Sequence, residues 1–241
     1  MGWTGAAGPA TARFAALEVK HTLAMTASPT TARGNGIRAV VAILVLIGLA
    51  AAARRAFVLI VPPSAPRFAA GAALDAGFAS HRLLTFAHIL PASLLFVLMP
   101  LQFVRRIRMR YPDLHRWGGR LVIVLGFMVA ISALIMSTTM SIGGVTEQTA
   151  TTLFAVLFLV FLSVGFQNIR RGRIARHREW MIRAFGVSLG IATTRPIVGA
   201  FFAARRLSPQ EFFGIAFWLG FTLTLSGAEV YIRTHRRFDI K

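Results

Sequence analysis

Apolar residues in this chain gather into runs of about twenty, and short polar or basic links separate the runs. A helix of that length, rising roughly 1.5 Å per residue, crosses a bilayer core of roughly 30 Å. The pattern therefore predicts an all-α polytopic membrane protein with six transmembrane helices. The predicted spans are residues 37–61, 82–104, 117–139, 150–169, 180–204 and 212–232.

The segments that flank the spans differ in composition. Residues 1–36 are rich in Ala, Gly, Thr and Pro and have no apolar period, which predicts a disordered tail. Residues 37–232 form the predicted six-span membrane domain, and residues 233–241 form a basic C-terminal tail. Small residues before Arg54-Arg55 also fit the cleavage site of a signal peptide. We favour an uncleaved first span because the apolar run continues beyond this arginine pair.

The charged residues predict an orientation. The formal net charge is +19, and the basic residues concentrate in the two terminal tails and in the links after the second and fourth spans. Six crossings place these four segments on one side, which the positive-inside rule assigns to the cytoplasm. We therefore expect an inner (plasma) membrane protein with both termini in the cytoplasm. The expected partners are the bilayer and its anionic head groups, not nucleic acid, because the basic residues lie between apolar runs.

The two basic links share a pattern. Residues 102–117 and 167–180 both open Gln-x-x-Arg-Arg-x-Arg and then reach a His-Arg pair with a Trp beyond. The echo predicts two related helical hairpins, made of spans two and three and of spans four and five, whose links lie side by side. The alternative is that two inner loops are simply rich in arginine. The residues expected to contact anions or lipid head groups are Arg105, Arg106, His115, Arg116, Arg170, Arg171, His177 and Arg178.

Several short motifs carry a family resemblance. They are His88-x-x-Pro91, Pro100-Leu-Gln102, Leu114-His-Arg-Trp-Gly-Gly-Arg120, His177-Arg-x-Trp-Met-Ile-Arg183, Thr194-Arg195 and Trp218 with Glu229. Residues 81–233 thereby resemble a family of bacterial predicted membrane proteins known as domain of unknown function 2306. The chain departs from the family pattern at Ala92, where glycine is common, and at Pro196. The resemblance implies a polytopic membrane protein and implies no activity.

Ionisable residues within the spans are the main candidates for function. His88 lies about 9 Å below the outer end of the second span, and Arg195 lies about 13 Å from the outer end of the fifth. Thr85 and Thr194 accompany them. No carboxylate is expected at that depth, so these four residues predict a site for a small anionic or amphipathic molecule between spans two and five. The alternative is a packing network in which Arg195 caps carbonyls freed by Pro196.

Two further pairs of residues invite an interpretation. Arg183 and Glu229 fall at matching depth on consecutive spans, which predicts a structural ion pair. His115 and His177 invite the hypothesis of a haem b with two axial histidines, but both lie at or before helix starts among arginines, which disfavours it. No other metal site is expected, and the chain has no cysteine.

Three functions remain open at this stage. The first is a transporter-like or sensor-like protein that binds a small anionic or amphipathic molecule. The second is an electron-transfer protein that uses haem or quinone, and the third is a structural subunit of a membrane complex. We favour a protein that is not an enzyme, because phosphate-binding loops, His-Glu-x-x-His and Gly-x-Ser-x-Gly motifs are missing from the sequence.

Overall fold

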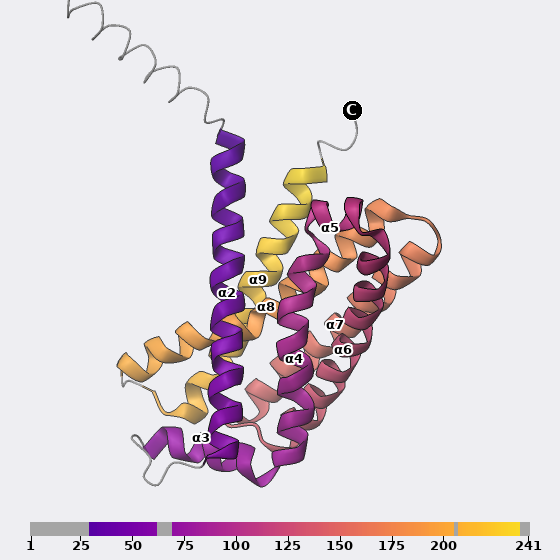
Figure 1. Cartoon of the computed structure of the whole chain (residues 1–241). Coiled ribbons are helices and arrows are strands. Elements are labelled where there is room, and N and C mark those ends of the chain that lie inside the picture. The colour runs from indigo at the N-terminus through magenta and orange to yellow at the C-terminus, as the bar shows by residue number, and fades with distance from the viewer. Residues whose placement is uncertain (1–28, 62–68, 205–206, 237–241) are drawn as a thin grey trace, which may run out of the picture. The chain divides into compact units, whose positions relative to one another are not determined.

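The computed structural model describes residues 29–61, 69–204 and 207–236, and these residues form helices joined by short turns (Figure 1). Six of the helices are long and apolar enough to cross a membrane. The prediction of an all-α protein with six candidate spans is confirmed. The helices are α2 (Pro29–Ile60), α3 (Ala69–Ser80), α4 (Arg82–Gln102), α5 (Arg105–Arg110), α6 (Pro112–Thr139), α7 (Gly144–Arg170), α8 (Ile174–Ala204) and α9 (Pro209–Arg236).

The chain divides into two units, residues 1–43 and residues 44–241. The described part of the first unit is the beginning of α2, a helix that continues into the second unit. The second unit contains the rest of α2 and all the other helices. The candidate site described below lies entirely in this second unit.

The helix boundaries correct several expectations. Helix α2 begins at Pro29, so residues 29–36 of the expected tail are helical, while residues 1–28 lie outside the described part. Helix α9 continues to Arg236, into the expected C-terminal tail. The connection expected at residues 62–81 contains α3, and the first basic link contains α5. The apolar pattern did not predict these two short helices, because neither is long enough to cross a bilayer.

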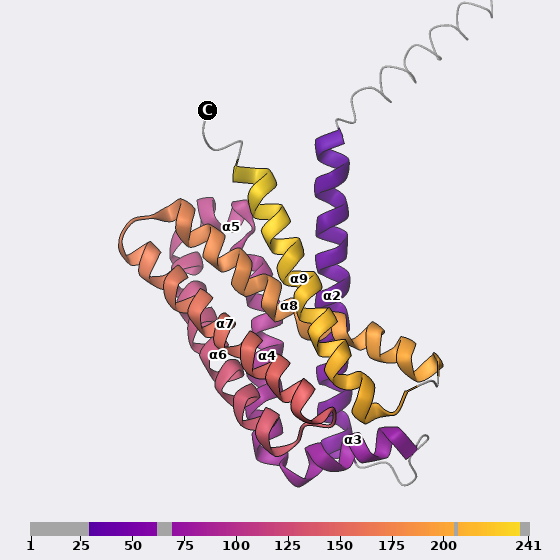
Figure 2. The same ribbon diagram turned by 180° about the vertical axis from the view of Figure 1, so that it is seen from behind.

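The second unit has two chemically different ends (Figures 1 and 2). We call one the basic end: it comprises residues 102–117, 170–178 and 233–236, and it carries α5 and the turn between α7 and α8. We call the other the distal end: it comprises residues 69–81 and 140–147, and it carries α3 and the turn between α6 and α7. This arrangement brings the two similar basic links to the same end, as the sequence predicts.

The core lies among α4, α6, α7 and α8. It is built from apolar side chains on the facing stripes of these helices, namely Leu95, Met99, Val122, Leu125, Ala130, Phe154, Phe158, Phe161, Leu162, Met181, Ala184 and Val187. Gly126 allows close packing, because a Cβ there would overlap the side chain of Leu162. The opposite stripes expose many large apolar residues, as expected for helices that face lipid.

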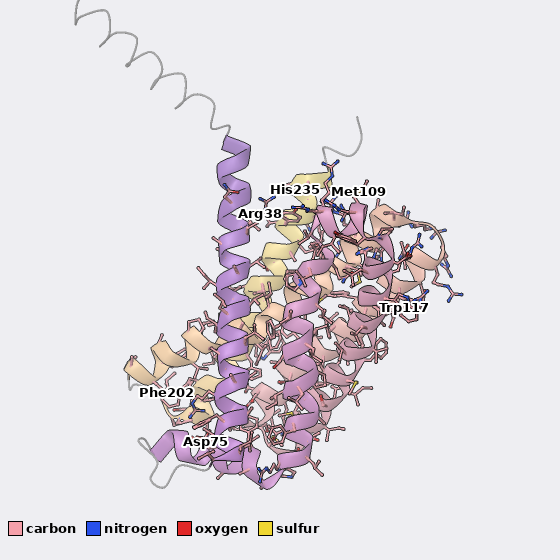
Figure 3. All side chains as sticks on the ribbon, in the orientation of Figure 1. Arg38, Asp75, Met109, Trp117, Phe202 and His235 are labelled. Carbon is pink, nitrogen blue, oxygen red and sulfur yellow. The ribbon has the colours of Figure 1, made fainter. Side chains whose placement is uncertain are left out.

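The C-terminal part of α8 packs against the N-terminal part of α9 through aromatic side chains. The ring of Phe212 stacks on Phe201 at 5.3 Å and meets Phe202 edge-on at 5.0 Å. The last turns of α8, which carry Phe202, project to the side together with the first turns of α9 (Figures 1, 2 and 3). Pro196 lies inside α8 just before these turns and removes one backbone hydrogen bond from the helix.

Candidate functional site

His88 is positioned by a hydrogen bond between neighbouring helices. Its Nδ1 lies 2.9 Å from the hydroxyl of Ser132 on α6. The Ser132 hydroxyl in turn donates to the carbonyl of Met128 at 2.7 Å, so it accepts from the Nδ1–H of the ring. This partition of protons leaves Nε2 of His88 as an acceptor. Sequence reasoning identified His88 but missed Ser132, because a helical serine that bonds its own backbone has no distinctive sequence signal.

Arg195 lies in α8 with no ion pair or hydrogen bond to any of the described residues. The residue is exposed. The charge of Arg195 acts on His88, which places the two within electrostatic reach of each other. The structure therefore brings together the two ionisable residues that the sequence singled out at the outer level of the spans.

Two more arginines lie in the same electrostatic neighbourhood. Arg54 and Arg55 of α2 both act on Arg195. They share one carboxylate, that of Asp75 on α3: Arg54 Nη2 lies 3.2 Å from Asp75 Oδ2, and Arg55 bonds Asp75 Oδ1. Arg55 also lies 3.8 Å above the ring of Phe78. Asp75 thus forms ion pairs with two arginines, near the C-terminal end of α2 (Figure 3).

Glu147 is the other carboxylate near Arg195, and it too is engaged. The residue is buried in the first turn of α7, where its Oε2 accepts the backbone N–H of Ile142 at 2.8 Å and of Gly143 at 2.6 Å. These bonds close the turn between α6 and α7. Sequence reasoning expected no carboxylate at the depth of Arg195, because it assigned Glu147 to the link before the fourth span.

The charges of this cluster do not cancel. Arg54, Arg55 and Arg195 supply three positive charges, while Asp75 and Glu147 supply two negative ones, which leaves a surplus of one. Both carboxylates have their own partners, so the surplus falls on Arg195. A guanidinium in that position favours an anionic partner from outside the chain.

The hydroxyls of the two threonines of the predicted site both donate to backbone carbonyls within the protein. The hydroxyl of Thr85 donates to the carbonyls of Phe78 and His81, each at 3.1 Å, and thereby ties α3 to the start of α4. The hydroxyl of Thr194 donates to the carbonyl of Ile191 at 2.6 Å. Both side chains are fully buried, so we leave them out of the proposed binding set.

A shallow apolar groove of about 530 Å³ runs between α4 and α6. Its walls are Leu84, Ala87, Ile123, Val124, Phe127, Met128, Ile131, Ser132 and Ile135. Ser132 is the only hydroxyl among them, and it is the residue that holds His88. The groove and the polar cluster therefore meet at the Ser132–His88 pair.

At the basic end, Arg183 and Glu229 form an ion pair between α8 and α9. Arg183 Nε bonds Glu229 Oε1, and Arg183 Nη2 lies 3.2 Å from Oε2. The guanidinium also lies 4.7 Å above the ring of Trp180. Both side chains are largely buried, at 17% and 32% exposure, which fits a pair that joins two helices.

The remaining predicted residues lie on the basic end. The six arginines among them are all exposed, whereas His115 and His177 are half-buried. His177 donates its Nδ1–H to the carbonyl of Gly165 at 2.8 Å. The charges of His177 and Arg108 act on His115, so the two histidines lie near each other at this end. The described residues contain no group of three or more potential metal ligands.

Comparison with known proteins places the chain in a family. Residues 85–232, more than half of the chain, match the family described as predicted membrane protein, DUF2306. The chain belongs to this family. No match was found among curated proteins or among solved structures.

The DUF2306 match covers only part of the candidate site. His88, Ser132, Glu147 and Arg195 lie within residues 85–232. The three residues of the Asp75 ion-pair cluster precede the match. The groove between α4 and α6 also falls within the match, apart from Leu84. The DUF2306 region therefore contains the polar pair His88 and Ser132, most of the groove, and Arg195, which has no ion pair or hydrogen bond to the described residues.

Proposed function

We propose that this DUF2306 protein binds a small anionic, amphipathic molecule at the outer level of its spans, with the anionic group at Arg195. The observation that carries the proposal is the position of Arg195: it is exposed, it lies within a spanning helix, and both carboxylates nearby are occupied by other partners. An arginine in hydrocarbon is costly unless it is paired or hydrated, so a carboxylate or phosphate ligand stabilises it.

His88 and the apolar groove support an amphipathic ligand. Nε2 of His88 is left as an acceptor, so it can take a hydrogen bond from a hydroxyl or another donor group on the ligand, within electrostatic reach of Arg195. The groove between α4 and α6 is lined in part by Ser132, the partner of His88, and its lining is apolar apart from that hydroxyl. A single hydrocarbon chain fits such a groove, while the anionic head remains at the Arg195 level.

The orientation belongs to the same proposal. The basic end faces the cytoplasm, and Arg195 is reached from the opposite side of an inner membrane. The support is the distribution of charge: the two basic links and the two terminal tails together carry most of the arginines and lysines, and the turn between α6 and α7 carries none. A transporter-like or sensor-like protein fits a site of this kind, because binding alone requires no catalytic group.

The proposal is tested with oleate as the anionic probe and oleyl alcohol as the neutral probe of matched chain length. Native mass spectrometry of the detergent-purified full chain measures both affinities. We expect the wild type to prefer oleate, and Arg195→Ala to lose about tenfold or more in oleate affinity with little change for the alcohol.

Arg82→Ala is the matched control, because it removes one exposed positive charge from the distal start of α4. It should leave both affinities unchanged. Equal binding of oleate and oleyl alcohol by the wild type would refute the proposal, whatever the variants do. An equal loss in Arg82→Ala would show that surface charge, not a site at Arg195, attracts the anion.

A further inference from the structure

Two buried polar atoms at the basic end have no hydrogen-bond partner among the described residues. They are Oε1 of Gln102, at the end of α4, and Nδ1 of His115, in the first turn of α6. Leaving a polar atom buried and unpaired costs about 1–3 kcal/mol. Both atoms belong to the same hairpin and both lie at the basic end, so they point to an occupant that the described residues do not supply.

The second hairpin contributes a histidine to the same region. His177 of α8 and Arg108 of α5 both act electrostatically on His115. The hydrogen bond from His177 Nδ1 to the carbonyl of Gly165 fixes the ring and leaves Nε2 available. The amide of Gln102 packs against Gly118, one helical turn after His115 on α6, so a Cβ on Gly118 would lie 2.6 Å from its Nε2. The two imidazoles, the guanidinium and this amide are therefore neighbours at the ends of α4, α5, α6 and α8.

The local charge excludes a cation and favours an anion. The two basic links contain ten arginines and only two carboxylates, Asp113 and Glu179. Asp113 is 3.2 Å from Arg116, and Glu179 also has an interaction of its own. A metal cation held by the two histidines would be repelled by these arginines, whereas an anion gains from them.

The unpaired oxygen of Gln102 restricts the kinds of anion that can bind here. The amide oxygen of Gln102 accepts a hydrogen bond but cannot donate one, so the ligand must carry a proton of its own as well as negative charge. A phosphate monoester does both, because its second pKa of about 6 leaves part of it protonated near neutrality. A phosphate diester has no such proton. The non-bridging phosphate oxygens accept from the guanidinium of Arg108 and from His115, whereas Nε2 of His177 is left as an acceptor by the bond from its Nδ1–H to Gly165.

We propose that Gln102, Arg108, His115 and His177 form a binding site for a phosphate monoester at the basic end of the protein. This site is separate from the one proposed at Arg195, which lies toward the distal end. The monoester is carried either by a lipid head group, such as that of phosphatidic acid, or by a soluble molecule. In both cases the phosphate donates to Gln102 Oε1 and accepts from His115.

The test is a titration of the detergent-purified full chain, followed by native mass spectrometry. The probes are phosphatidic acid, phosphatidylglycerol of the same acyl chains as the diester counterpart, and glycerol 3-phosphate as the soluble monoester. We expect phosphatidic acid to bind about tenfold more tightly than phosphatidylglycerol. Competition by glycerol 3-phosphate would identify a soluble source, and its failure to compete would identify the lipid.

Matched variants separate this site from general attraction to arginine. His115→Ala and Gln102→Leu should each abolish the preference for phosphatidic acid. His235→Ala and Gln167→Leu should keep it, because His235 bonds the carbonyl of Tyr231 at the same end and Gln167 is the exposed counterpart of Gln102 in the second link. Equal affinity of the wild type for the two lipids overturns the proposal even if every variant misfolds. A loss of preference in the two controls overturns it as well.

Discussion

Charged side chains within the spans of this protein obtain their stabilisation from different partners. Glu147 accepts two backbone N–H groups, and Arg183 pairs with Glu229 on the next helix. Arg195 has neither kind of partner among the described residues. The first two are therefore explained by the fold, whereas Arg195 is the residue for which we propose a partner from outside the chain.

Glu147 should be important for stability. Replacing it by alanine leaves the N–H groups of Ile142 and Gly143 without an acceptor in a buried turn. We expect Glu147→Ala to reduce the free energy of unfolding by about 2–3 kcal/mol, and Glu147→Gln to reduce it less because one amide oxygen remains. Unfolding in detergent, followed by circular dichroism, measures both. A neutral Glu147→Ala variant would contradict the role given to the carboxylate.

The Arg183–Glu229 pair should show a measurable coupling. A double-mutant cycle with Arg183→Ala and Glu229→Ala is expected to give about 1–2 kcal/mol, because both partners are largely buried. The pair of Asp113 and Arg116, at 82% and 70% exposure, is the control and should give less than about 0.5 kcal/mol. Equal coupling in the two pairs would contradict the argument from burial.

At the residue scale, the sequence identifies the ionisable residues but not their partners. His88 and Arg195 stand out because a charge or an imidazole inside an apolar run is rare. Ser132, Asp75 and the turn-closing role of Glu147 depend on which helices are neighbours, and an apolar pattern does not encode that. Depth can be counted along one helix, but contacts between helices require the fold.

At the scale of helices, α8 and α9 approach each other through glycines. A Cβ on Gly220 would lie 2.9 Å from the backbone nitrogen of Thr194 and 3.0 Å from the carbonyl oxygen of Gly190. A Cβ on Gly190 would overlap the ring of Phe221. Backbone atoms cannot give way as a flexible side chain can, so the separation of these helices depends on hydrogen side chains at these positions.

Alanine at Gly220 should therefore push the two helices apart. We expect Gly220→Ala to lower the free energy of unfolding by about 1–3 kcal/mol. Gly227→Ala in the same helix is the control, since no atom lies within 4 Å of its Cβ position, and it should be neutral or stabilising. Thermal unfolding in detergent compares the two variants. Equal stability of the Gly220→Ala and Gly227→Ala variants would contradict a close approach of α8 and α9 at Gly220.

The long helices were predictable and the short ones were not. Each long helix contains an apolar run of spanning length, and such a run has few alternatives in a bilayer. The ends of these helices extend beyond the runs, as at Pro112 and Ile174, because polar residues continue a helix without changing its apolar content. Helices α3 and α5 are too short to carry a spanning signal.

At the scale of the whole molecule, the proposed orientation is testable because the chain contains no cysteine. Single cysteines at Met109 and Gly172 should be protected from a membrane-impermeant maleimide added outside intact cells, whereas one at Val145 should react. The reason is that the first two positions lie on the basic end and the third lies at the distal end. Met109 and the exposed Trp117 mark the basic end in Figure 3.

Permeabilised cells provide the reference, since all three cysteines should react there. Labelling of positions 109 and 172 from opposite sides would contradict the hairpin arrangement. Labelling of both from the outside would keep the arrangement and reverse the orientation. The first outcome would show that the number of membrane crossings is wrong. The second would show that the basic end faces outward, against the positive-inside rule.

Under the proposed function, the surplus charge at Arg195 couples ligand binding to membrane voltage. Counted along a straight helix, Arg195 lies about 13 Å into a hydrocarbon layer of roughly 30 Å, and the sideways course of the last turns of α8 (Figure 1) makes this depth an upper limit. An anion that reaches Arg195 from outside therefore crosses at most about two-fifths of the field. An interior-negative potential of 100 mV opposes this movement by at most about 1 kcal/mol, because a full crossing involves about 2.3 kcal/mol. Energised vesicles should therefore release such an anion more readily than depolarised ones, by a factor of up to about five.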